Sequence, residues 1–135
     1  MAGLVLKLRP KERFMVNGVV LQNGEKRSNI VVVSEDVNVL RLRDAIHPED
    51  AKTPVKRVCY ITQLVLAGEA DPSEASFQIL RGIEQLSQVF TDPDSKTHLD
   101  NATKSIGMKQ FYQALKSLRA LLAREERLLA VAAAS

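Results

Sequence analysis

The spacing of apolar residues changes near residue 46, and this change limits the possible folds more than any other feature of the chain. In the first part, leucine occupies every second position of residues 4–8, with Lys7 and Arg9 on the opposite side, which is typical of a strand with one buried face. In the second part, apolar residues recur every three or four positions, the period of a helix that buries one face. Strands followed by helices in a chain of 135 residues predict one small α+β protein.

Residues 1–46 are predicted to form a β-rich region of four or five short strands. Further strand-like segments lie at residues 13–16, 19–22, 30–33 and 37–43. Asn17-Gly18 separates the first two of these and favours a tight hairpin turn, because both residues tolerate positive φ. We expect an antiparallel meander or a small barrel. A unit this small buries too little surface to be stable alone, so it should pack on the helices or on a second copy.

Residues 47–130 are predicted to form a four-helix bundle packed against the β region. Three helices begin at a capping residue followed by proline, namely Thr53-Pro54, Asp71-Pro72 and Asp92-Pro93. The fourth and longest helix is expected to bury one continuous face, formed by Phe111, Leu115, Leu118, Leu122 and Leu129. Residues 131–135 are predicted to be a frayed tail.

The residue types argue against catalysis. Cys59 is the only cysteine and stands among apolar residues, so it is predicted to be an inert core thiol rather than a nucleophile or zinc ligand. His47 and His98 lack ligand neighbours at helical spacing, and there is no glycine-rich phosphate loop. The pair Glu125-Glu126 is expected on a solvated helix surface. We predict a protein that is not an enzyme and needs no metal or other cofactor.

Location can be predicted from what the chain lacks. No stretch approaches the roughly 18 consecutive apolar residues of a membrane span. The amino terminus does not resemble a signal peptide, because it has no long apolar core after a basic segment. We therefore expect a soluble cytoplasmic protein that does not bind membranes.

The basic charge lies in the β-rich region. The chain has a net charge of +3, and residues 1–46, with eight basic and five acidic residues, account for all of it. The six cations on or beside predicted strands are Lys7, Arg9, Lys11, Arg13, Arg41 and Arg43. If the first and last strands lie side by side, these six would form a strip that binds RNA phosphates. The alternative is that they coat a solvent face and protect an edge strand from aggregation.

Aromatic residues limit how RNA would be bound. Phe14, Phe77, Phe90 and Phe111 all fit apolar core positions, so no stacking platform for bases is expected on the strands. Recognition would then depend on arginine and on backbone hydrogen bonds. Replacing Lys116, in the helical part, by alanine is expected to leave RNA affinity nearly unchanged.

Several segments carry a resemblance to a known family. They are Glu12-Arg13-Phe14-Met15-Val16-Asn17-Gly18, Gln22-Asn23-Gly24, Val39-Leu40-Arg41, Ala51-Lys52-Thr53-Pro54-Val55-Lys56-Arg57 and Gly107-x-x-x-Phe111-Tyr112-Gln113-Ala114-Leu115-Lys116. In this order they resemble the FlbT family of flagellum-biosynthesis regulators over nearly the whole chain. The resemblance implies binding to the 5′ untranslated leader of flagellin mRNA, followed by degradation of the message or a block of translation. The resemblance leaves open whether flagellin synthesis falls or rises. It also implies the flagellin regulator FlaF as a partner.

The first third also resembles the carbon storage regulator CsrA, a β-strand dimer that binds RNA leaders. Glu12-x-Phe14-Met15-Val16-x-Gly18 is similar to the Glu-x-Leu-Met-Ile-Gly segment of that family. Val39-Leu40-Arg41 and Leu42-Arg43-Asp44 are alternative counterparts of its Val-His-Arg-Glu strand, so Arg41 and Arg43 are both candidates for the arginine that contacts RNA. The chain lacks the histidine and has one extra residue before Gly18. We expect a homodimer.

A second hypothesis is a protein–protein adaptor in flagellum assembly that acts on mRNA only through a partner. Helices with wide apolar faces can dock other proteins. The residues that would form such a face are Leu118, Leu121, Leu122, Leu128 and Leu129.

Overall fold

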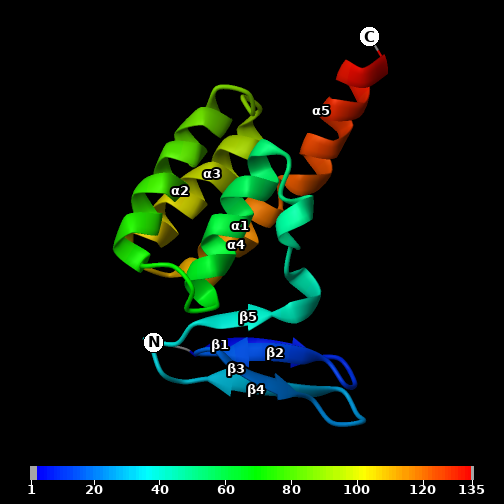
Figure 1. Cartoon of the computed structure of the whole chain (residues 1–135), viewed down its shortest axis with the longest axis vertical. Coiled ribbons are helices and arrows are strands. Elements are labelled where there is room, and N and C mark those ends of the chain that lie inside the picture. Colours follow the sequence, from blue (N-terminus) through cyan, green and yellow to red (C-terminus); the bar gives the residue numbers. More distant parts are fainter. Residues whose placement is uncertain (1–2, 135) are drawn as a thin grey trace.

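The computed structural model describes residues 3–134, which form a small β region at one end of a group of helices (Figure 1). The strands are β1 (Leu4–Leu8), β2 (Arg13–Val16), β3 (Val19–Gln22), β4 (Ser28–Val32) and β5 (Val39–Arg41). Two short 3-10 helices follow, η1 (Leu42–Asp44) and η2 (Pro48–Asp50). The helices are α1 (Pro54–Leu66), α2 (Pro72–Ser87), α3 (Pro93–Gly107), α4 (Phe111–Arg119) and α5 (Leu122–Ala134). The α+β class is confirmed.

The strands form two small antiparallel sheets rather than one meander. β1 pairs with β4, and β2 lies between β3 and β5. The turn at Asn17 (φ 50°) and Gly18 (φ 81°) joins β2 to β3, as predicted. The first and last strands do not pair, because β4 occupies the edge of β1 and β5 adds to β2. Strand partners depend on contacts between distant residues, which the local pattern does not specify.

β5 lies between two apolar cores. Val39 is buried in the smaller core with Leu6, Leu8 and Phe14. The next residue, Leu40, is buried in the larger core of the helices. Successive side chains of a strand point to opposite faces, so one short strand contacts both cores. Tyr112 of α4 also packs against both.

Three helices begin where the sequence predicts. The side chains of Thr53, Asp71 and Asp92 each accept a hydrogen bond from a backbone amide of the first turn, and proline follows each of them. α1 lies between α2 and α4 and buries six side chains (Figure 1). Cys59 is completely buried in α1, and burial raises the pKa of its thiol to about 12.

The predicted fourth helix is two helices, so the chain has five helices over the described residues. The helical path is interrupted at 120–121, where the amide of Leu121 bonds to the carbonyl of Leu118 (3.0 Å). α5 then projects away from the other helices (Figure 1), and Leu129, expected in the core, is 47% exposed. Neither glycine nor proline marks this break. Its cause is long-range, because the first turn of α5 binds the amino-terminal ends of α1 and α3.

Other details differ from the sequence predictions. Phe77 is 78% exposed on α2, although its spacing suggested a core position. Residues 131–134, predicted to be part of a frayed tail, belong to α5, and Ser135 lies outside the described residues. Across residues 3–134, no helix is both long and apolar enough to span a membrane.

Candidate nucleic-acid interface

A buried ion pair stands at the centre of the β region. Glu12, in the turn between β1 and β2, accepts hydrogen bonds from Arg41 of β5 at both carboxylate oxygens, with Nε–Oε2 2.7 Å and Nη2–Oε1 2.8 Å. The two side chains are only 4% and 11% exposed. The hydrogen bond from Arg41 is the main reason why the pKa of Glu12 falls from 4.5 to about 2, and the pairing raises the pKa of Arg41. The carboxylate is therefore charged at neutral pH.

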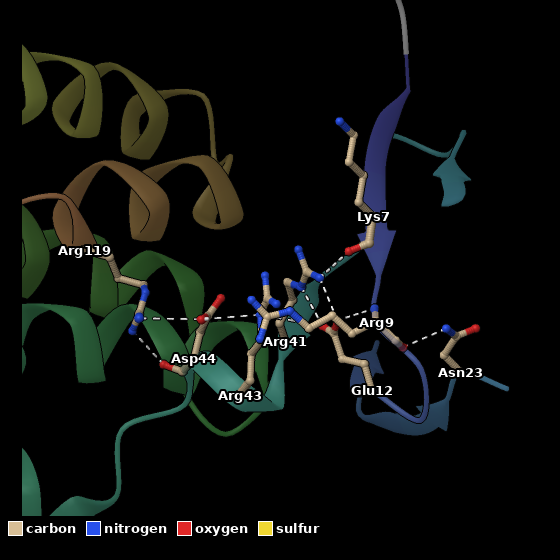
Figure 2. A network of polar contacts seen from close by, with 8 residues as sticks. All are labelled: Lys7, Arg9, Glu12, Asn23, Arg41, Arg43, Asp44 and Arg119. Carbon is tan, nitrogen blue, oxygen red and sulfur yellow. Dashed lines mark hydrogen bonds and ion pairs between the residues drawn. The ribbon is translucent and has the colours of Figure 1, made fainter. Parts of the chain in front are cut away.

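Arg41 also joins the two sheets. Its Nη2 donates to the backbone carbonyl of Lys7 in β1 at 2.5 Å, while Glu12 accepts the amide of Arg9 at 3.0 Å (Figure 2). The arginine thus connects β5, the β1–β2 turn and β1 itself. Because its guanidinium is largely buried and already hydrogen-bonded, we interpret Arg41 as a structural residue that positions its neighbours.

A groove of about 400 Å³ lies beside this ion pair, between the β region and α4. Its charged lining comes from two parts of the chain that are far apart in sequence: Lys7, Arg41, Arg43 and Asp44 from the first third, and Lys116 and Arg119 from α4. Val5, Tyr112 and Leu115 complete the lining. Five cations thus face the groove against one acid, so its field favours anions.

Asp44 holds two of these arginines in place. Arg119 donates from Nη1 to the Asp44 carbonyl at 2.8 Å, and its Nη2 lies 3.5 Å from the Asp44 carboxylate. Arg43 lies between the carboxylates of Glu12 and Asp44, with Nε at 3.8 and 3.9 Å (Figure 2). These are ion pairs without a close hydrogen bond, and the Arg43 side chain is 38% exposed. Arg43 can therefore offer donors to a ligand.

The structure divides the six predicted cations into two groups. Lys7, Arg41 and Arg43 line the groove, whereas Arg9, Lys11 and Arg13 do not. Lys11 pairs with Glu25 at 3.6 Å, and Arg13 donates to Gln22 at 3.1 Å. The continuous strip of six residues is therefore not formed, because it required β1 and β5 to pair.

The contribution of α4 to the groove was not predicted from the sequence. Lys116, which was expected to be a control residue, lines the same groove as Lys7 and Arg43. Tyr112, Lys116 and Arg119 are spaced by four and three residues, which places them on one face of α4. That spacing is the only local sign of the site. The packing of Tyr112 against the smaller core brings α4 to the strands.

The chain matches the family described as flagellar protein FlbT over residues 4–129. This range includes both sheets, α1 to α4, most of α5 and the whole cationic groove. The chain belongs to the FlbT family. FlbT proteins with similar sequences include one from Bradyrhizobium diazoefficiens, named probable flagellum biosynthesis repressor protein FlbT 1, which is 32% identical over 93% of this chain and 84% of its own length.

Two Caulobacter FlbT proteins are also similar. The one from Caulobacter sp. strain K31 is 29% identical over 91% of this chain and 93% of its own length. The flagellum biosynthesis repressor protein FlbT of Caulobacter vibrioides strain ATCC 19089 is 25% identical over 91% of this chain and 86% of its own length. No solved structure matches this chain. These relatives are named as flagellum biosynthesis repressors, so the FlbT family is a family of regulators rather than enzymes.

Proposed function

We propose that this FlbT protein acts in the cytoplasm on flagellin synthesis, by binding the 5′ untranslated leader of flagellin mRNA in the cationic groove. The names of its relatives support a role as a repressor of flagellum biosynthesis. The observation that carries the RNA proposal is the convergence of cations from two distant segments on one groove. The proposed phosphate ligands are Lys7, Arg43, Lys116 and Arg119.

The chemistry of the groove suits an RNA backbone. Arginine binds phosphate oxygens through paired hydrogen bonds, and lysine supplies a mobile point charge. The volume of about 400 Å³ is that of a small-ligand site, so it would hold a short length of backbone rather than a helix. A leader held there would be withheld from ribosomes and left open to nucleases, which lowers flagellin synthesis by blocked translation or degradation.

The proposal is tested by gel shift and fluorescence anisotropy with purified protein and a flagellin leader transcript. Replacing Arg43 and Lys116 by alanine together should weaken binding at least about tenfold at low salt. The slope of log affinity against log salt should also fall by about 1.4, because two phosphate contacts to single-stranded RNA are lost. Both side chains are exposed, so the fold should be retained.

The matched control removes two cations outside the groove. Arg9→Ala combined with Arg13→Ala lowers the net charge by the same amount, but neither residue lines the groove. Affinity should change less than about threefold in this variant. Equal losses in the two double variants would mean that RNA responds only to net charge, and would contradict the groove as the binding site.

The adaptor hypothesis is weaker. Leu118 and Leu121, two residues of its predicted face, are completely buried. Leu128 and Leu129 are exposed and favour a smaller docking surface on α5. If this protein acts only through a partner such as FlaF, it should not shift the leader by itself at low salt, and adding FlaF should restore the shift.

A further inference from the structure

α5 projects from the molecule but is held firmly at its base. The buried carboxylate of Glu125 accepts hydrogen bonds from the hydroxyl of Thr53 and from the amide of Val55 (2.8 Å), at the start of α1. Arg124 donates to Ser95 and to Asp94 (2.7 Å), at the start of α3. One turn of α5 thus binds the ends of two other helices. The direction of the projecting part is therefore fixed.

The projecting part of α5 forms one wall of an apolar groove of about 480 Å³. Leu128 and Leu129 stand on that wall, 45% and 47% exposed, and Val89, two residues after the end of α2, also lines the groove and is 64% exposed. The floor is the contact between α1 and α2 at Val58 and Gly82. A Cβ at Gly82 would lie 2.5 Å from a methyl carbon of Val58, so glycine permits this close approach.

We propose that the groove is filled by α5 of a second copy of this chain, so that the protein forms a two-fold dimer. In a two-fold interface one surface must supply both the inserted residues and their pocket. The surface around α5 does so, because Leu128 and Leu129 project from a helix that also forms a wall of the groove. Each copy inserts its leucines against the α1–α2 floor of the other.

The charges beside the groove match this arrangement. Arg57 and Arg81 stand at its rim, and both are exposed. On α5, the exposed Glu126 lies three residues before Leu129 and therefore on an adjoining face. Among residues 3–134, neither Arg81 nor Glu126 takes part in an ion pair. In the dimer, Glu126 of one copy faces the arginines of its partner, which favours a second copy over an unrelated apolar helix.

The dimer leaves the RNA surface free. No residue lines both the apolar groove and the cationic groove, and α5 projects from the end of the molecule opposite the β region (Figure 1). Two cationic grooves would then be available to one transcript, which increases apparent affinity without a new contact. The inference does not depend on RNA binding.

The test is the mass of the full chain in solution, measured by light scattering after size exclusion and by sedimentation over a concentration series. The wild-type protein should be a dimer. The double variant that carries Leu128→Glu and Leu129→Glu should be a monomer with an unchanged circular dichroism spectrum. Met108→Glu is the matched control, because Met108 is 68% exposed at the end of α3 and outside the apolar groove. It should stay dimeric.

Charge reversal gives a second test that does not depend on the leucines. Glu126→Arg and Arg81→Glu should each raise the dimer dissociation constant about fivefold, and combining them should restore it. A wild type that is monomeric at all concentrations would overturn the proposal. So would a dimer that survives both leucine substitutions, since that dimer must use another surface.

Discussion

Two buried glutamates hold distant segments of this FlbT protein together, but they bind different kinds of partner. Glu12, which is 8% exposed when its backbone is included, binds the guanidinium of Arg41 and so connects the first turn to the last strand. Glu125, 5% exposed, accepts from neutral donors, the hydroxyl of Thr53 and the amide of Val55. It connects the last helix to the start of α1.

The two glutamates differ in which groups lose their hydrogen-bond partner when the carboxylate is removed. Without Glu12, a mostly buried cation has lost its counter-ion, and the penalty for an unpaired buried charge is large. Without Glu125, a hydroxyl and an amide lose an acceptor at a helix end, where the donors are neutral and the helix dipole supplies only a partial charge. The β region should therefore be more sensitive to loss of its carboxylate than α5.

The largest expected effect is that of Glu12→Ala. We expect a loss of about 3 to 4 kcal/mol in the free energy of unfolding, measured by urea denaturation, because Arg41 becomes an uncompensated buried charge. Glu25→Ala is a suitable control, since its pair with Lys11 is exposed, and it should change stability by less than about 1 kcal/mol. Similar losses in both variants would show that the buried pair has no special role.

Acid should reproduce part of this loss. The pKa of Glu12 is about 2 in the folded protein against a usual 4.5, so its contribution is complete above pH 4.5 and is lost as the pH falls toward 2. The contribution is about 3 kcal/mol. Chemical denaturation across this range should show a steeper decline for wild type than for Glu12→Gln. Parallel curves would contradict the assignment.

Glu125→Ala should have the smallest effect of the three. Loss of the acceptor for Thr53 and Val55 is expected to cost about 1 to 2 kcal/mol in the free energy of unfolding. It should also increase hydrogen exchange in the first turns of α1 and α5. The neighbouring Glu126 is exposed, so Glu126→Ala should leave both measurements nearly unchanged. A loss larger than that of Glu12→Ala would reverse the comparison.

The features that sequence predicted well are local ones. The Asn17-Gly18 turn and the three proline starts are each specified by two adjacent residues, whose backbone preferences operate in any context. Burial of Leu6 and Leu8 follows from alternation within one strand. For these elements the local sequence pattern was enough to predict the structure.

The features that sequence missed depend on contacts between distant segments. Glu125 was expected on a solvated surface because its neighbours are charged, and its burial follows from the position of α1, 70 residues earlier. The interruption of the helix before α5 also depends on contacts with distant segments. Only part of the cationic groove was predicted. Lys7, Arg41 and Arg43 were candidates from the sequence, whereas Lys116 and Arg119 belong to α4 and reach the groove only in the folded chain.

The position of Tyr112 gives this protein a natural optical probe. The chain has no tryptophan and two tyrosines, so phenol emission is not masked by energy transfer to indole. Tyr112 touches both apolar cores and also lines the cationic groove beside Arg41. Its emission therefore reports on the junction of the two halves and on occupancy of the groove, without an added label.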